Sequence, residues 1–412
     1  MKYLSKAVAW GVLLSVSLFG FESTVGTTGY MRIQTSLEGD KANLCFQAPY
    51  TYSKYRLGNE CESWIELGAY NDLKLDNGLA IHTQIRPIFF GPNNEALELF
   101  GWGEAYSEIS GLFANGTKLW VGRRFYQRYD SHITDYFFLN SSGDGVGATD
   151  IPLYGGHFAY SFFLDRLSPT ANDDDYYLQH HDIRWSYKRG EDELTLVFNY
   201  MMLSDNLNVD GVALGLLYKI GSLELGSLKG ESTSAISYGN GVAKNAFQYA
   251  PNVPSQLDRE NFIDTIISTG DAIESAKTWR ILNHTAVEND YIGLMSNLAY
   301  EYRDEEQFDS KKQEWLSAGL RGYWFVNRNF RTVLELGYDR VDDTISDSTY
   351  ELLKTTAALE LAFEKGVWQR PVLRLYYTHA DWNDASKGLI GTQEYADSTS
   401  AETIGIQLEY WW

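Results

Sequence analysis

Large aromatic side chains share strand faces with charged side chains at several places in the sequence. Because successive side chains of a strand point to opposite faces, three such pairs are predicted: Trp64 with Glu66, Tyr30 with Arg32, and Trp411 with Glu409. Aromatic rings pack against apolar C–H surfaces, whereas charged groups exchange hydrogen bonds with hydroxyls. This combination suits a ligand with apolar faces and hydroxyl edges, which is the chemistry of a sugar ring.

The segments that hold these residues alternate between apolar and polar side chains, as β-strands do. Residues 332–339 and 373–378 alternate in this way. The final segment sets Ile404, Ile406, Leu408, Tyr410 and Trp412 against Gly405, Gln407, Glu409 and Trp411. One face suits lipid and the other suits water. A soluble β-sandwich gives the same alternation, but the aromatic ending favours a strand that meets a membrane interface.

The first residues are typical of an export signal. Lys2 and Lys6 precede an apolar stretch, residues 7–20, that is too short to span a bilayer as a helix. We expect a signal peptide over residues 1–23, with cleavage between Gly20 and Thr27, followed by a single β-barrel domain over residues 24–412. No later apolar run is long enough for a membrane helix.

Composition narrows the class of protein further. Aromatic residues make up 15% of the 412 residues, and only 8 residues are Pro, which suits many strands and two interfacial aromatic belts. The net charge of −21 argues against a nucleic-acid partner, because phosphate binding uses clustered Lys and Arg. We expect the acidic residues to lie in loops that face water. Outer-membrane lipid and lipopolysaccharide are the expected neighbours of these loops.

Short and long connections alternate along the chain, as expected when tight turns lie on one side of a membrane and loops on the other. Tight turns are predicted at residues 76–78 and 188–190. The longest irregular region, residues 230–277, is predicted to be an external loop, with a short helix capped by Ser255 or Asp258. The cysteines, Cys45 and Cys61, predict one local disulfide that closes a small surface loop.

Several long motifs resemble the maltoporin family. They are Cys45-Phe-Gln, Ser53-Lys-Tyr-Arg-Leu-Gly-Asn-Glu-Cys61-Glu, Trp120-Val-Gly-Arg-Arg-Phe-Tyr-Gln-Arg128-Tyr-Asp130-Ser-His132 with Asp135, Arg280-Ile-Leu-Asn-His284, Leu336-Gly-Tyr-Asp339, Trp368-Gln-Arg370-Pro371 and Trp411-Trp412. The resemblance implies an all-β transmembrane antiparallel barrel of 18 strands with an inward-folded constriction loop. It also implies a homotrimer in the outer membrane of a Gram-negative bacterium that passes maltose or maltodextrin-type oligosaccharides by passive diffusion.

The family guides sugars along an aromatic slide beside a polar track. The matching slide positions are Tyr30, Trp64, Trp368 and Trp411. The matching track and constriction positions are Arg32, Arg56, Glu66, Arg128, Asp130, His132, Asp135 and Phe137. Two other roles stay open: a barrel aromatic can belong to the interfacial girdle, and an Arg–Asp cluster can simply fix the inward loop to the wall.

Departures from the family pattern fall on the selectivity groups. Phe137 stands where maltoporins carry a tyrosine, Asn140 where they carry an aspartate, and a wall arginine is replaced near Gly103. Candidates for the slide residue that a neighbouring subunit lends are Phe89, Phe90 and Trp102. Sucrose, another oligosaccharide or another small solute therefore stays possible as substrate.

Two other classes of protein remain as alternatives. A secreted glycoside hydrolase would use paired carboxylates such as Glu335 and Asp339, and a general porin would conduct ions without binding sugar. A cluster of acids and histidines is interpreted as a solvated external loop, because it lacks the ligand spacing of a metal site: Asp173, Asp174, Asp175, His180, His181 and Asp182. We expect no enzyme activity, no cofactor and no bound metal.

Overall fold

The structure is a computed structural model that describes most of the chain. The described residues are 21–37, 45–51, 54–60, 62–92, 97–167, 176–204, 209–244, 246, 275–304, 312–344, 346–391 and 395–412. The predicted signal peptide and the predicted helix at Ser255 or Asp258 lie largely or wholly outside these residues. Within the described part, no helix is long and apolar enough to cross a membrane.

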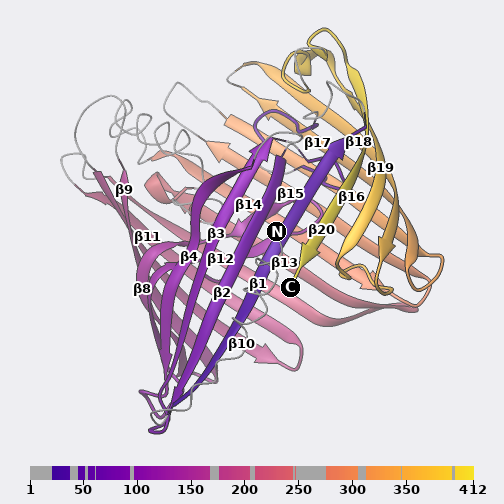
Figure 1. Cartoon of the computed structure of the whole chain (residues 1–412). Coiled ribbons are helices and arrows are strands. Elements are labelled where there is room, and N and C mark those ends of the chain that lie inside the picture. The colour runs from indigo at the N-terminus through magenta and orange to yellow at the C-terminus, as the bar shows by residue number, and fades with distance from the viewer. Residues whose placement is uncertain are drawn as a thin grey trace.

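The described residues contain eighteen antiparallel strands that form one closed sheet (Figure 1). In chain order they are β1 (Phe21–Ser36), β2 (Glu62–Leu75), β3 (Ala80–Pro92), β4 (Glu98–Ser110), β5 (Lys118–Arg124), β8 (Gly143–Leu153), β9 (Gly156–Leu167), β10 (Tyr176–Arg189), β11 (Asp192–Ser204), β12 (Asp210–Leu225), β13 (Leu228–Asn240), β14 (Lys277–Glu288), β15 (Ile292–Asp304), β16 (Lys312–Phe325), β17 (Phe330–Asp343), β18 (Ser348–Ala362), β19 (Val372–Trp382) and β20 (Ser400–Trp411). Each strand pairs with its neighbours in sequence, and β1 pairs with β20 to close the barrel.

The other elements of the described part of the chain are short. A separate two-stranded hairpin, β6 (Tyr129–Ser131) and β7 (Tyr136–Leu139), lies between β5 and β8, and one-turn 3-10 helices occur at Gly241–Ala243 and Asp384–Ser386. The predicted strand count, antiparallel order and inward-folded loop are therefore confirmed.

The polar and apolar faces of the strands are inverted relative to a soluble protein. In β17, Arg331, Glu335 and Asp339 are at most 2% exposed, whereas Leu334 and Leu336 are 39% and 44% exposed. The same alternation continues along β19 and β20, as the sequence predicts. Charged side chains therefore face the inside of the barrel, and apolar side chains form an outer face suited to hydrocarbon.

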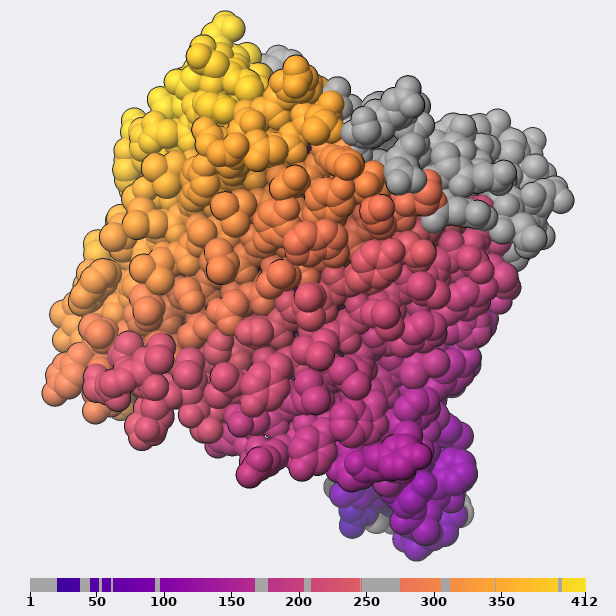
Figure 2. Space-filling view, turned by 180° about the vertical axis from the view of Figure 1, so that it is seen from behind, coloured from indigo at the N-terminus to yellow at the C-terminus, as the bar shows by residue number. Residues whose placement is uncertain are grey.

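Figure 2, a space-filling view of the back of the molecule, shows a continuous outer wall. Large apolar side chains project from this wall, among them Leu196, Leu214, Leu216 and Ile236, each at least 40% exposed. An exposed apolar surface of this extent is stable only against lipid or another subunit. The wall therefore fits a membrane protein and excludes the soluble sandwich.

Short turns and long loops lie at opposite ends of the strands. The predicted tight turns form at Gly78 and Gly190, whose φ angles of +85° and +64° favour glycine. The predicted long loop is shorter than expected at its start, because β13 continues to Asn240 and pairs on both sides, with β12 and with β14. Small alternating residues in β13 gave a weak strand signal.

The seam of the barrel, where β1 pairs with β20, joins two strands that extend to different distances. Residues Tyr30 to Ser36 of β1 pair with β20, and Gly29 exchanges two backbone hydrogen bonds with Trp412 at 3.1 and 3.2 Å. Residues 21–28 of β1 pair with β2 alone. The strands after β1 therefore extend past the end of β20 on the short-turn side.

Candidate functional site

Two segments fold into the bore and meet there. We call residues 125–142, which contain β6 and β7, the L3 hairpin, and the described part of residues 45–60 the L1 segment. Tyr136 of the L3 hairpin donates a hydrogen bond to Glu301 of β15 at 3.1 Å. Tyr55 of the L1 segment is hydrogen-bonded to Ser317 of β16 at 2.9 Å. Both segments therefore contact the inner wall opposite their own strands.

The L1 segment corrects the prediction of a small surface loop. Phe46, Tyr55 and Leu57 are at most 1% exposed, because they pack inside the barrel. A Cβ atom added to Gly319 or Gly337 would lie within 2.0 Å of the Tyr55 ring, so these glycines form the notch that receives it. Cys45 is described but Cys61 is not, and the disulfide between them stays a prediction.

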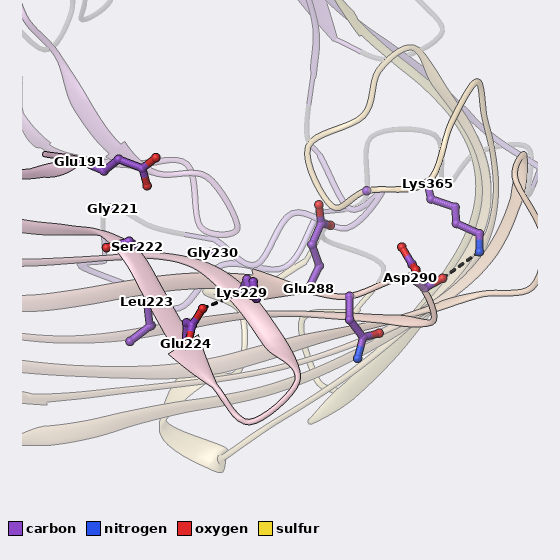
Figure 3. A pocket seen from close by; sticks show the side chains of 12 residues that line it. Glu191, Gly221, Ser222, Leu223, Glu224, Lys229, Gly230, Glu288, Asp290 and Lys365 are labelled. Atoms are coloured by element: carbon purple, nitrogen blue, oxygen red, sulfur yellow. Dashed lines mark hydrogen bonds and ion pairs between the residues drawn. The ribbon is translucent and has the colours of Figure 1, made fainter.

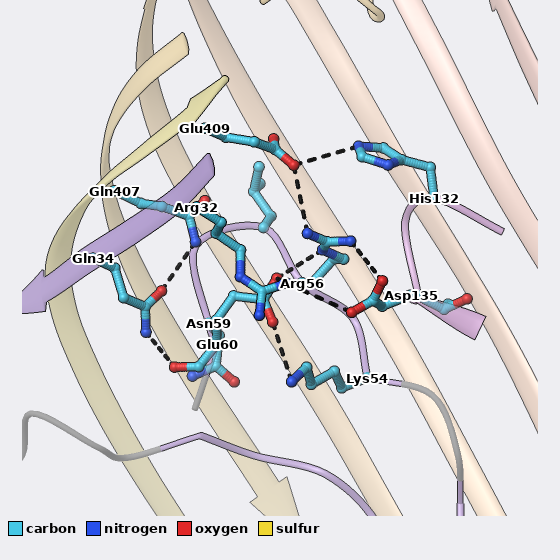
Figure 4. A network of polar contacts seen from close by, with 12 residues as sticks. Arg32, Gln34, Lys54, Arg56, Asn59, Glu60, His132, Asp135, Gln407 and Glu409 are labelled. Carbon is cyan, nitrogen blue, oxygen red and sulfur yellow. Dashed lines mark hydrogen bonds and ion pairs between the residues drawn. The ribbon is translucent and has the colours of Figure 1, made fainter. Parts of the chain in front are cut away.

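A buried ion network joins both segments to the seam of the barrel (Figure 4). Glu60 is fully buried and accepts contacts from Arg56 at 2.7 Å, and from Arg32 and Lys54 at 3.2 Å each. Asp135 of the L3 hairpin contacts Arg56 at 2.8 Å and Arg32 at 3.6 Å. Its left-handed backbone, with φ of +57°, is one that aspartate tolerates.

The charges of this network compensate one another. Burial raises the pKa of Glu60, but the opposing effect of Arg32, Arg56 and Lys54 is greater and brings that pKa to about 2. Breaking a buried pair from one side leaves an uncompensated charge, which typically costs about 3–5 kcal/mol. Arg32, Arg56 and Asp135 therefore fix the L1 segment and the L3 hairpin to the wall.

Two of the four predicted slide aromatics lie beside one histidine of the L3 hairpin, and a third, Tyr30, is paired with one of them. Tyr30 of β1 pairs in register with Trp411 of β20, and its hydroxyl donates to Glu409 at 3.2 Å. The ring of His132 lies 5.7 Å from that of Trp411 and 5.4 Å from that of Trp368, centroid to centroid. The structure thus brings Tyr30, Trp411 and Trp368 together on one side of the bore.

Burial and a hydrogen bond from Arg370 both keep His132 neutral. Its guanidinium lies 4.4 Å above the Trp411 ring and donates to Nε2 of His132 at 3.1 Å. Since a guanidinium has no acceptor, Nε2 must accept, and the imidazole is neutral. Burial lowers the pKa of His132 well below its usual value, against the opposing effect of Glu409. His132 therefore acts as a neutral ring beside both tryptophans.

The fourth slide residue, Trp64, belongs to a separate aromatic cluster on β2 to β4. Its ring lies 5.9 Å from Phe90 and 5.8 Å from Phe100, and its Nε1 donates to Glu66 at 3.0 Å. Trp64 pairs in register with Arg32, which lies two residues from Tyr30 on the same face of β1. Aromatic rings therefore follow one another across β2, β1 and β20. Phe90, a candidate for the slide residue lent to a neighbouring subunit, lies beside Trp64 of its own chain, and Phe100 is a member that no feature of the sequence indicated.

Arg128 and Asp130 differ from the other charged residues of the constriction. Cζ of Arg128 lies 3.6 Å from the centroid of Phe125 and 5.0 Å from that of Phe137. A Cβ atom at Gly103 would come within 2.6 Å of Phe125, so this glycine makes room for the ring. Among the described residues, neither Arg128 nor Asp130 has an ion-pair partner within 4 Å. Arg128 is partly exposed and Asp130 is exposed. Their donors and acceptors are available to a solute.

Other residues that the sequence predicts for the functional site make contacts that stabilise the barrel wall. Glu66 contacts Arg86 at 3.0 Å. Asn140 is 4% exposed and accepts a hydrogen bond from Ser142 at 2.7 Å, so it does not face the bore. Glu335 contacts Arg321 and the backbone N–H of Leu57, the latter at 2.9 Å. The carboxylates considered for a hydrolase are therefore part of the wall.

The predicted acid and histidine loop is partly strand instead. Residues 173–175 lie outside the described residues, but His180 and Asp182 are buried in β10, where Asp182 contacts Arg184 at 2.7 Å. His181 points to the outer face, where its ring lies 5.0 Å from Phe162. These residues belong to a barrel strand because they pair with both β9 and β11. The described residues contain no group of metal ligands.

The short-turn mouth of the barrel holds an acidic hollow of about 550 Å³ (Figure 3). It is lined by turns on the side of β11 to β15 and by the turn before β19. Its charged residues are Glu191, Glu224, Glu288, Asp290, Lys229 and Lys365. Negative side chains therefore outnumber positive ones at this mouth.

Comparison with known proteins agrees with this fold. The family model described as LamB porin matches residues 25–412. OccK2 (OpdF) of Pseudomonas aeruginosa is similar with 10% identity and a TM-score of 0.50, over 95% of this chain and 97% of that chain. The trimer form of OmpT, an outer membrane protein of Vibrio cholerae, has 11% identity and a TM-score of 0.42, over 95% and 99% of the two chains. At 10% identity, the likeness to OccK2 shows a shared fold.

Proposed function

Because the chain belongs to the LamB porin family, we propose that this outer-membrane channel is selective for sugars, with maltose or maltodextrin-type oligosaccharides as the first substrates to test. Transport is passive, and the protein carries no enzymatic activity in this proposal. By resemblance to the family, three copies form a homotrimer with one bore in each. Sucrose or another neutral oligosaccharide is the nearest alternative substrate.

The observation that supports this proposal is the free polar pair beside the aromatic rings. Most charged residues at the constriction are bound to one another, but Arg128 and Asp130 have no ion-pair partner among the described residues, which leaves donors of Arg128 and acceptors of Asp130 for a solute. A sugar hydroxyl both donates and accepts, so it can bridge two groups of this kind. The rings of Trp64, Tyr30, Trp411 and Trp368 provide apolar surface for the opposite side of the sugar.

The phenylalanine at position 137 fits the same interpretation. Phe125 and Phe137 hold the Arg128 guanidinium by its flat faces and take none of its hydrogen-bond donors. The arginine is therefore positioned while its N–H groups stay available to the bore. Weak, exchangeable hydrogen bonds of this type let a solute bind and still leave, as a channel requires.

The test is planar-bilayer conductance of the purified protein titrated with maltose-series sugars and with sucrose. We expect sugars to block the ion current. In Arg128→Gln the block weakens about three- to tenfold, since one hydrogen bond contributes about 1 kcal/mol. Arg340→Gln, on the outer face, is the matched control and leaves the block unchanged. Ion current that no sugar blocks would instead identify a general diffusion channel.

A further inference from the structure

A second row of aromatic side chains lies inside the barrel, near its short turns. Tyr70 of β2, His82 of β3 and Tyr106 of β4 come from adjacent strands. The ring centroids of Tyr70 and His82 lie 5.7 Å apart with an interplanar angle of 29°, and those of His82 and Tyr106 lie 5.7 Å apart at 45°. Cζ of Arg124 lies 4.6 Å from the Tyr106 centroid. These four flat groups form one continuous surface, which we call the mouth platform.

The mouth platform faces the bore. Tyr70 has the same strand parity as Glu66, and Tyr106 has the same parity as Glu104, and both glutamates are buried inside the barrel. Outward neighbours such as Ile85 are instead 47% exposed. Inner faces of such barrels are normally polar, so a row of aromatic rings there needs a specific reason.

Charged groups border the rings of the platform. Asp72 contacts Nδ1 of His82 at 2.7 Å, and Glu108 contacts Arg124 at 2.8 Å. All four of these side chains keep 16–43% of their surface exposed. Carboxylate oxygens and guanidinium donors are therefore accessible at the edge of the aromatic surface, where the hydroxyls of a stacked sugar ring would lie.

The backbone is shaped to hold the first ring of the platform. A Cβ atom at Gly26 of β1 would lie 2.3 Å from Cζ of Tyr70, so the tyrosine ring lies directly against the glycine. Any larger residue at position 26 would move Tyr70 away from β1 or clash with it. Gly26 of β1 and Tyr70 of β2 therefore fix the position of the platform together.

The mouth platform is separate from the slide. Tyr70 follows Trp64 by six residues on β2, which at about 3.4 Å per residue places it about 20 Å further toward the short turns. The slide passes from β2 to β1 and β20, whereas the platform passes from β2 to β5. Figure 1 shows β1 to β4 running side by side toward one end of the molecule.

We propose that Tyr70, His82 and Tyr106 form a second carbohydrate-binding site at the short-turn mouth, which receives a sugar ring as it leaves the bore. The inference rests on the proposed sugar selectivity. Short turns of outer-membrane barrels face the periplasm, so the site would bind sugar on the periplasmic side. Its aromatic surface stacks on the sugar ring, and Asp72, Glu108 and Arg124 bind the hydroxyls.

The experiment adds maltohexaose to one side of a bilayer at a time and measures the rate at which it blocks single channels. In Tyr106→Ala we expect the association rate from the short-turn side to fall about three- to tenfold, because one stacking contact is lost. Association from the loop side stays unchanged. His82→Ala gives the same one-sided loss, and a sugar-free conductance equal to that of the unaltered protein shows that each variant has folded.

Tyr218→Ala is the matched control, because Tyr218 is 42% exposed on the outer face. It leaves association from both sides unchanged. Unchanged short-turn association in both Tyr106→Ala and His82→Ala, or an equal loss from both sides, overturns the mouth platform while the slide remains. If maltohexaose does not block the unaltered protein from either side, the proposed function fails and the platform fails with it.

Discussion

At the scale of single residues, the face on which a side chain lies decides its role. Trp411 and Trp412 are consecutive and chemically identical. Trp411 contacts His132 and Arg370 inside the barrel, whereas Trp412 is stacked on Tyr410 at 5.0 Å, on the outer face, and covers Gly29. One is a candidate for sugar binding, and the other fits the interfacial aromatic girdle.

This pair gives the sharpest mutational test of the slide. Trp411→Ala should weaken the sugar block of current about three- to tenfold, because it removes one aromatic surface from the bore. Trp412→Ala removes the same ring from the outer face and should leave the block unchanged. The measurement is current block by maltooligosaccharides in planar bilayers. An equal effect of both substitutions would mean that the two residues act through barrel stability alone.

The pH dependence of binding should depend on Asp130. The Asp130 carboxyl faces the bore, but its position deep inside the barrel raises its pKa. The negative charge of Asp135 raises that pKa further. As pH falls, Asp130 therefore loses its charge earlier than an ordinary aspartate. We expect the sugar block to weaken on acidification, and we expect this step to be absent in Asp130→Asn. Identical pH profiles of block in the two proteins would remove Asp130 from the binding site.

At the scale of elements, the L1 segment and the L3 hairpin depend on Glu60. Glu60→Gln leaves Arg32, Lys54 and Arg56 without their shared buried carboxylate, a loss of about 3–5 kcal/mol. We expect faster backbone hydrogen exchange over the described residues of the L1 segment, measured by mass spectrometry. Glu62→Gln is the matched control. The Glu62 side chain contacts Arg32 and Lys54 but is 20% exposed, so the effect of its substitution on hydrogen exchange should be much smaller. Equal exchange in both variants would contradict the role of Glu60.

The acid stability of this network follows from the same carboxyl group. Because the pKa of Glu60 in the folded protein, about 2, lies below that of an unfolded glutamate, its contribution is complete above about pH 5. It is lost as the pH falls toward 2. Hydrogen exchange in the L1 segment should therefore stay slow at mildly acidic pH.

The strands were predictable from the sequence because the period of alternation is a local property. Leu334 and Leu336 face out and Glu335 faces in, as the pattern alone predicts. The position of the L1 segment was not predictable, because it depends on residues far away in the sequence. Its notch is formed by Gly319 and Gly337, and the backbone N–H of Leu57 donates to Glu335, 278 residues later.

The candidate site was predictable in part for the same reason. The residue types and their inward direction follow from strand parity and from the family motifs. What the sequence could not show is which charges neutralise one another. Arg56 and Asp135 are paired, whereas Arg128 and Asp130 have no ion-pair partner among the described residues, and this difference depends on how the L3 hairpin rests on the wall.

At the scale of the whole molecule, charge should make the channel prefer cations. The chain carries a net charge of −21, and four carboxylates line the hollow at the short-turn mouth against two lysines. Negative walls raise the local concentration of cations. A potassium chloride gradient across a bilayer should give a reversal potential on the cation-selective side. The preference should decrease near 1 M salt, where the Debye length is about 3 Å.

A double variant tests where this selectivity arises. Glu191→Gln with Asp290→Asn removes two negative charges from the hollow and should shift the reversal potential toward zero. Both residues are absent from the slide, so sugar block should be retained. A reversal potential that does not move would assign ion selectivity to the constriction instead of the mouth.

The two-residue period of the strands also limits how such a chain can change over time. Adding one residue between Phe330 and Arg331 of β17 would turn Arg331 toward hydrocarbon and Leu334 toward water, and every later side chain of that strand would be misplaced with them. Adding two residues would restore the original order. Lineages derived from this protein should therefore differ in length mainly in loops, and strand lengths should change by even numbers or through a bulge.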